Sequence, residues 1–92
     1  MEFESYLLNF IRRVESDARI NKGHLSIYMS LLFLWSRQDY SMPFEIFSRE
    51  VMPIAKISSA TTFHCMIREL ASYGYIKYSP SFYKNKGSIV EL

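Results

Sequence analysis

The sequence is poor in cysteine and has no long apolar run, and these shortages exclude several classes of protein. Cys65 is the only cysteine in 92 residues, so the chain cannot build a disulfide framework and has too few soft ligands for a structural zinc site. The mostly apolar run at residues 25–35 contains Ser26 and Ser30 and is too short to span a bilayer. No secretory signal opens the chain. We therefore expect a cytoplasmic location.

Strong charge and catalytic motifs are also missing. Eleven Lys and Arg residues against nine Asp and Glu residues give a formal net charge of +2, which permits a polyanionic partner without demanding one. No carboxylate pair, metal-ligand cluster or nucleophile with a base stands at motif spacing, and His24 and His64 lack such partners. We expect no enzyme activity, no metal and no cofactor. The sequence identifies no small-molecule ligand and no membrane contact.

Apolar residues, by contrast, are plentiful. They make up 49% of the chain, with aromatics at 16%, which is ample for the core of one small domain. We expect a single domain over residues 1–92, with helices in 1–38 and a second part in 44–92. Either it is the amino-terminal part of a longer protein or it stands alone.

Two helices are predicted in the amino-terminal part. The first covers residues 2–18, because six apolar residues share one stripe at helical spacing: Phe3, Leu7, Phe10, Ile11, Val14 and Ala18. The second covers 24–37 and is apolar on nearly every side, so it needs cover from the rest of the domain or from a second copy of the chain. Four residues are expected to be exposed or half-exposed, in packing or dimerisation rather than a ligand pocket: Tyr6, Leu8, Tyr28 and Trp35.

The second half has the outline of a winged helix-turn-helix. We expect a short strand at 44–47, a helix at 49–55 capped by Ser48, a turn at 56–58 and a helix at 59–73 that ends at Gly74. Strands at 75–79 and 88–92 then flank a polar, basic tip. The predicted fold class is mainly α with a small β-hairpin (α+β), with about four helices and a wing sheet of two or three strands.

The helix at 59–73 has one apolar and one polar face. Its packing side holds Phe63, Met66, Ile67, Leu70 and Tyr73, and its outer side holds Thr61, His64, Cys65, Arg68 and Ser72. In a helix-turn-helix the outer side enters the major groove, where an arginine can donate two hydrogen bonds to guanine. Arg68 is therefore the expected base reader, whereas Cys65 is better explained as a small space-filling residue than as a redox sensor.

Phosphate contacts are expected from hydroxyls at the start of this helix and from cations around it. Ser59 is the residue most readily explained as an ordinary cap, and His64 is equally well explained as a solvated surface residue. The wing tip brings together Tyr83, Lys84, Asn85 and Lys86, and Arg49 can add a backbone contact. The predicted DNA-binding residues are Ser59, Thr61, Thr62, His64, Arg68, Lys56, Tyr83, Lys84 and Lys86.

These residues also carry a family resemblance. The segment KISSATTFHCMIRELASYGYIKYSPSFYKNKGSIVEL, with HLSIYMSLLFLW upstream, resembles the winged-helix domain of bacterial transcription regulators and replication initiators, often linked to mobile elements. The resemblance spans residues 24–92. It implies DNA binding through the second helix of the motif at Thr61, Thr62, His64 and Arg68, and through the wing at Lys84 and Lys86.

The function expected from the sequence is sequence-selective binding of double-stranded DNA by a transcription regulator, with a homodimer as a possible assembly. The outer helix face offers a single arginine, so affinity would need a second chain or a neighbouring domain. A replication-initiator type of DNA-binding domain is one alternative. The other is a winged helix that serves protein contacts or dimerisation, because the same scaffold serves both uses.

Overall fold

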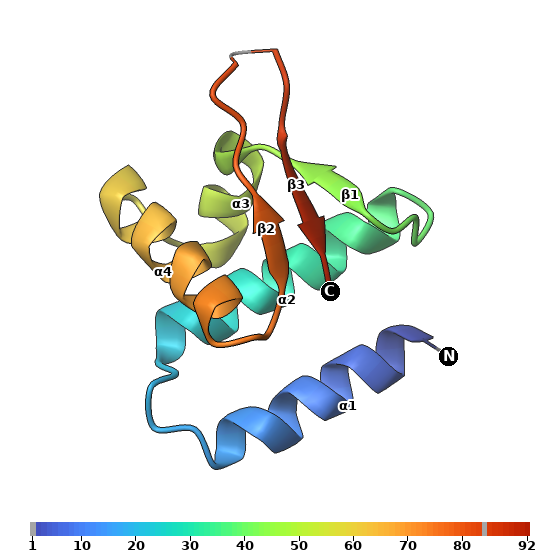
Figure 1. Ribbon diagram of the computed structural model, residues 1–92, viewed down its shortest axis with the longest axis vertical. Helices are drawn as coiled ribbons and strands as arrows, with labels where there is room; N and C mark the ends of the chain where they lie inside the picture. Colours follow the sequence, from blue (N-terminus) through green and yellow to red (C-terminus); the bar gives the residue numbers. More distant parts are fainter. Residues whose placement is uncertain (1, 84) are drawn as a thin grey trace.

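The computed structural model describes residues 2–83 and 85–92, and Figure 1 shows the order of their elements. Within these residues four helices and a three-stranded antiparallel sheet occur. In chain order they are α1 (Glu2–Glu15), α2 (Lys22–Arg37), β1 (Phe44–Ile46), α3 (Ser48–Ala55), α4 (Ala60–Ser72), β2 (Lys77–Ser79) and β3 (Ser88–Glu91). The predicted α+β class is confirmed, and the arrangement is compatible with a winged-helix-like fold.

Helix α1 is shorter than predicted. It ends at Glu15 because the Asp17 side chain accepts the Arg19 backbone N–H at 3.1 Å and holds a turn there. Ala18 is therefore outside the helix and exposed. The predicted stripe is also wrong at Ile11, which is 45% exposed, whereas Phe10 is buried at 2%. Neighbouring residues point in different directions around a helix, so the side that carries Phe10 packs on the core while Ile11 faces solvent.

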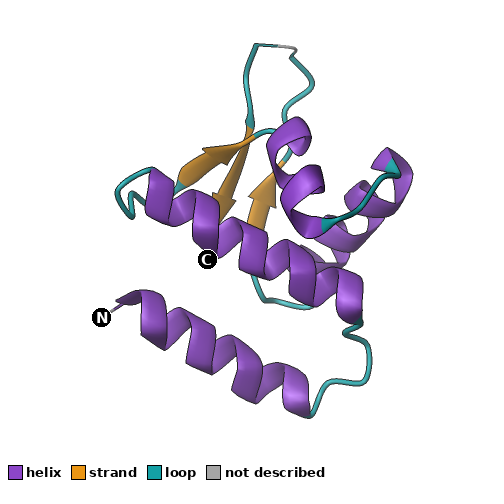
Figure 2. Ribbon diagram, turned by 180° about the vertical axis from the view of Figure 1, so that it is seen from behind, coloured by secondary structure: helices purple, strands orange, loops and turns teal. Residues whose placement is uncertain are grey.

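Helix α2 lies at the centre of the molecule, between α1 on one side and α3, α4 and the sheet on the other (Figure 2). It starts at Lys22, earlier than predicted, because Asn21 and His24 form a capping box: the Asn21 side chain accepts from His24 N–H while the Asn21 N–H donates to His24 Nδ1. In the described part of the chain, no helix combines the length and the apolar character needed to cross a membrane.

The apolar sides of α2 are mostly covered by other elements of the same chain. The domain itself buries most of them, and Tyr28 and Trp35, which we expected to be at least half-exposed, are only 3% and 1% exposed. Trp35 lies in a cluster of aromatic rings with Phe3, Tyr6 and Tyr40. A single stripe remains open, where Met29 and Phe33 are 45% and 46% exposed. The sequence could not show this, because the covering residues come from α1 and the second half.

Helices α3 and α4 form the helix-turn-helix. The cap of α3 is Phe47, without a side-chain hydrogen bond, and Ser48 is the first helical residue, so the predicted Ser48 cap is wrong. Lys56 ends α3 in the left-handed conformation, at φ 61°. The predicted Ser59 cap of α4 is confirmed, because its side chain accepts the Thr62 N–H at 3.2 Å.

The sheet joins the hairpin to the start of the second half. Its strand order is β1-β3-β2, with Val90 of β3 opposite both Phe44 and Tyr78. This confirms the predicted first strand, one residue shorter than expected. Strand β2 is also shorter, because the Tyr75 N–H donates to Leu70 O at 2.9 Å and closes the end of α4 before the sheet begins. Beyond the sheet the hairpin loop projects away from α1 (Figures 1 and 2).

Candidate nucleic-acid interface

The orientation of α4 is fixed by a buried face and one polar tie. Phe63, Ile67 and Leu70 are each at most 1% exposed, and this is the packing side that the sequence predicts. The buried imidazole of His24 adds a hydrogen bond, Nε2 to Glu69 Oε1 at 2.9 Å. Because His24 Nδ1 already accepts from the Asn21 N–H, Nε2 carries the proton and donates it. This bond locks the rotation of α4 against α2.

The opposite side of α4 is open to solvent, as predicted. Thr61, Cys65, Arg68 and Ser72 are exposed, His64 is half-buried, and these side chains border a shallow hollow along the helix. We call these five residues the outer face. Arg68 forms no hydrogen bond or ion pair with another described residue, so its guanidinium donors are all available to a partner.

The first turn of α4 presents two exposed hydroxyls. Thr61 and Thr62 are both exposed, beside backbone N–H groups that have no partner within the helix. The hydroxyl of Ser59 is occupied by the Thr62 N–H. Ser59 therefore acts as a cap, the alternative we considered for it, while the two threonines are free to meet an anion.

His64 belongs to two surfaces at once. It borders the hollow along α4 and also a smaller pocket between α4 and the wing. Its Nδ1 lies 2.8 Å from Ala60 O, so Nδ1 must carry a proton and neutral His64 offers Nε2 as an acceptor. That arrangement suits an amino group on a base edge better than a phosphate oxygen.

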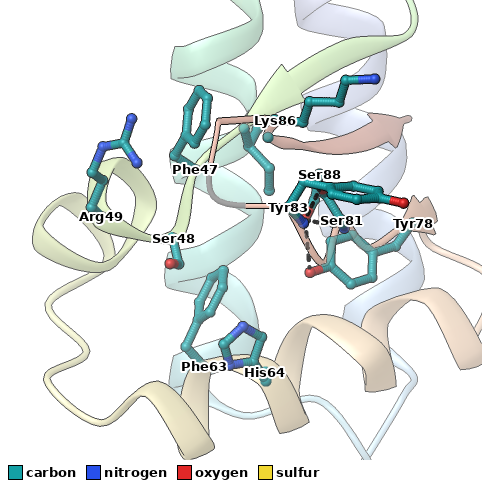
Figure 3. A pocket seen from close by; sticks show the side chains of 12 residues that line it. Phe47, Ser48, Arg49, Phe63, His64, Tyr78, Ser81, Tyr83, Lys86 and Ser88 are labelled. Atoms are coloured by element: carbon teal, nitrogen blue, oxygen red, sulfur yellow. Dashed lines mark hydrogen bonds between the residues drawn. The ribbon is translucent and has the colours of Figure 1, made fainter.

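The smaller pocket, which we call the notch, separates α4 from the wing. It has a volume of about 170 Å³ and is bordered by the junction of β1 and α3, by α4 and by the hairpin. Figure 3 shows Ser48, Phe63, His64 and Tyr83 around it. The notch brings together four of the residues singled out in the sequence, namely Arg49, His64, Tyr83 and Lys86. They come from three separate segments.

The start of α3 borders the notch and presents uncapped backbone N–H groups, which favour an anion. The N–H groups of Glu50 and Val51 both donate to Phe47 O, and no side chain of the described residues caps the first two N–H groups of the helix. The guanidinium of Arg49 stacks over the Phe47 ring, 4.1 Å from its centre. This uncapped end differs from the predicted one, in which the Ser48 hydroxyl closes the start of the helix.

The wing is tied at its base by short polar contacts. Ser88 Oγ accepts the Ser81 N–H at 3.2 Å and lies 3.4 Å from the Tyr78 hydroxyl. On the other side, the Gly87 N–H donates to Glu45 Oε2 at 3.0 Å. These contacts hold the loop over the notch. These contacts have no local signal in the sequence, because Gly87 and Glu45 are 42 positions apart and a polar residue does not reveal which segment it will meet.

The wing tip is exposed and partly aromatic. Phe82 and Tyr83 are 88% and 75% exposed, and Asn85 and Lys86 are also exposed. Phe82 was missed in the sequence, although it is the most exposed large apolar side chain in residues 2–83 and 85–92. Lys84, a predicted contact, lies outside the described residues.

Lys56 borders neither the notch nor the hollow along α4. It is exposed in the turn between α3 and α4, beside a second surface depression that Arg49 also borders. Arg49 thus lies between Lys56 and the notch. Within the described part of the chain, no group of three or more His, Cys, Asp or Glu residues could hold a metal ion.

Comparison of the chain with protein-family models, with curated proteins and with solved structures found no match.

Proposed function

We propose that this protein binds double-stranded DNA sequence-selectively as a transcription regulator. The observation that carries the proposal is the notch, because it places Arg49, His64 and Lys86 next to the helix that exposes an unpaired Arg68. A helix face with an unpaired arginine suits the major groove, and cations beside it suit the phosphates that border that groove. The family resemblance of residues 24–92 favours the same function.

Each element has a distinct role in this proposal. Arg68 reads guanine, with His64 Nε2 as an acceptor for a base amino group. Thr61 and Thr62 donate to one phosphate at the start of α4, and the notch receives another between Arg49 and Lys86. The exposed Phe82 can pack against sugars in the minor groove or wedge between base steps. Lys56, Tyr83 and Lys84 add contacts to the backbone.

The direct test is selection from a pool of duplexes with a randomised centre at low salt, followed by titration of the enriched duplex and of a scrambled one. We expect one motif to be enriched and to bind at least tenfold more tightly than the scrambled duplex. If the folded protein enriches nothing and binds neither duplex, the proposal fails.

A protein-interaction function is the second candidate, and it rests on exposed apolar residues. Leu8 and Ile11 of α1 are 50% and 45% exposed, as are Met29 and Phe33 of α2 at 45% and 46%. We call these four residues the amino-terminal apolar set. In the DNA-binding proposal the amino-terminal apolar set forms the contact between two chains, and the dimer then makes twice as many base contacts as a single chain. In the alternative they are the functional surface, and charge changes at the wing would leave function intact.

A further inference from the structure

A cavity of about 440 Å³ is bordered by residues of α1, of α2 and of the connection from α4 to β2; Figure 1 shows how these elements are arranged. Its volume falls within the range of small-molecule sites. Its lining includes Tyr6, Arg12 and Arg13 of α1, Tyr28 of α2, and Gly74 and Tyr75 of the connection.

The hydroxyl of the buried residue Tyr28 lines this cavity and has no hydrogen-bond partner among the described residues. Tyr28 is only 3% exposed and stacks on Phe10, with ring centres 3.8 Å apart, yet its hydroxyl bonds to no other described residue. Among the described residues, Trp35 Nε1 is the only fully buried side-chain N or O atom without a hydrogen-bond partner. The Tyr28 hydroxyl also has no partner among these residues, so it is not fully buried and is accessible from the cavity. Burial raises the pKa of Tyr28 to about 12, so its hydroxyl, which is already protonated at neutral pH, stays a donor under more alkaline conditions.

The charge around this donor is positive. The Arg13 guanidinium is held 4.1 Å from the centre of the Tyr75 ring and donates from Nη1 to Gly74 O at 3.3 Å. Arg12 borders the same cavity, and no described Asp or Glu lines it. No Asp or Glu side chain of the described lining residues therefore competes with an anion for the remaining donors of these arginines, and Leu92 also borders the cavity.

The Asp17 carboxylate, which binds the Tyr75 hydroxyl, does not line the cavity. Asp17 accepts the Tyr75 hydroxyl at 2.7 Å and pairs with Arg19 Nη2 at 2.8 Å, so it neither fills the cavity nor leaves the Tyr75 hydroxyl free for a ligand. Part of the remaining wall is aromatic, because Phe10 meets Tyr28 face to face and Tyr75 edge to face at 5.4 Å. A flat apolar body would fit these rings.

We propose that this cavity binds a small planar carboxylate, with its charge on Arg12 and Arg13, one oxygen accepting from the Tyr28 hydroxyl, and its ring against Tyr6 and Tyr75. The site is separate from the outer face and the notch, and the proposal does not depend on DNA binding.

Benzoate is a suitable probe, with benzyl alcohol as its uncharged counterpart. In a ¹H–¹⁵N titration of the whole chain at constant ionic strength, we expect saturable shifts at Arg13, Gly74 and Tyr75 with benzoate. Benzyl alcohol should bind at least tenfold more weakly. Tyr28→Phe keeps the ring stack and removes only the donor, so benzoate affinity should fall about five- to tenfold.

Arg12→Gln is a second variant, because this exposed residue can change without disturbing the fold, and it should also weaken benzoate. Arg37→Gln, at the end of α2 and outside the lining, is the matched control and should bind as the parent does. The proposal is overturned if benzoate and benzyl alcohol bind equally, if the shifts fall elsewhere, or if Tyr28→Phe and Arg12→Gln both bind benzoate like the parent.

Discussion

At the residue scale, DNA selectivity should depend on Arg68. Removing its guanidinium in Arg68→Ala should cost about 1–3 kcal/mol of binding free energy for the selected duplex, because a bidentate contact to guanine is lost. The same change should reduce the preference for that duplex over the scrambled one. Fluorescence anisotropy measures both quantities. Arg37→Ala removes an exposed arginine of α2 and serves as the control. Equal losses in the two variants would contradict the role of Arg68.

Lys86 should act on affinity rather than on selectivity. Because each neutralised phosphate contributes about 0.9 to the slope of log K against log salt, Lys86→Gln should lower that slope by about one. The ratio between selected and scrambled duplexes should stay unchanged. The control is Lys77→Gln, since Lys77 Nζ lies 3.6 Å from Glu91 at the base of the sheet. Lys84→Gln is expected to behave like Lys86→Gln. An unchanged salt slope in Lys86→Gln would remove the wing from the interface.

Asp17 should make stability depend on acid pH. Hydrogen bonds from Arg19 and then from the Tyr75 hydroxyl hold the pKa of Asp17 well below its usual range. A lowered folded-state pKa gives a contribution that is present above the unfolded value of about 3.9 and is lost as the pH falls through the folded value. Asp17→Asn should therefore be less stable than the parent at pH 7, and the two should converge in acid.

Urea unfolding of both proteins between neutral and acid pH measures this difference. Tyr75→Phe removes one of the two donors to Asp17 and should show an intermediate pH dependence. A gap between the parent and Asp17→Asn that stays constant with pH would contradict the assignment.

At the element scale, the position of the wing depends on the contact between β1 and the start of β3. A Cβ at Gly87 would overlap Glu45 Cγ and lie 2.6 Å from the Ile46 carbonyl oxygen, and the backbone there cannot move without opening the sheet. Gly87→Ala should cost about 1–3 kcal/mol of unfolding free energy, as other overpacked sites do. It should also weaken DNA binding, because the wing moves away from the notch.

Gly23→Ala is the matched variant for this experiment. A Cβ at Gly23 would overlap Sδ and Cε of Met66, the end of a flexible side chain that can rotate away. Alanine in a helix gains up to about 1 kcal/mol over glycine, so this variant should be close to neutral. Thermal unfolding of both variants measures the contrast, and equal stabilities would show that the wing is not held by close packing at Gly87.

At the scale of the whole molecule, the amino-terminal apolar set predicts self-association. Sedimentation should show a concentration-dependent dimer, and Phe33→Glu should abolish it. Because Phe33 is 46% exposed, the variant should still fold, and its unfolding temperature should match that of the parent at concentrations where the parent is monomeric. Ile54→Glu changes an exposed apolar residue of α3, 40% exposed, and should leave the dimer intact. A parent protein that stays monomeric at high concentration would reject the pairing.

The sequence by itself determined the elements with local signals. The ends of α4 follow from the Ser59 cap and from Gly74, at φ 85°, and its buried face follows from helical periodicity. These features depend on residues within a few positions of one another, so the chain specifies them without its tertiary contacts. The place of Arg68 on the outer face follows in the same way, whereas its lack of a partner among the described residues is known only from the structure.

Only the tertiary structure decided which surfaces are covered and which residues meet. The burial of Tyr28 and Trp35 depends on residues of other elements, as does the notch that joins Arg49, His64 and Lys86. The bonds that fix this geometry span the chain: His24 to Glu69 is 45 positions apart, and Glu45 to Gly87 is 42. Burial and pairing at such separations depend on how the helices and strands pack together, and a local sequence pattern does not specify that packing.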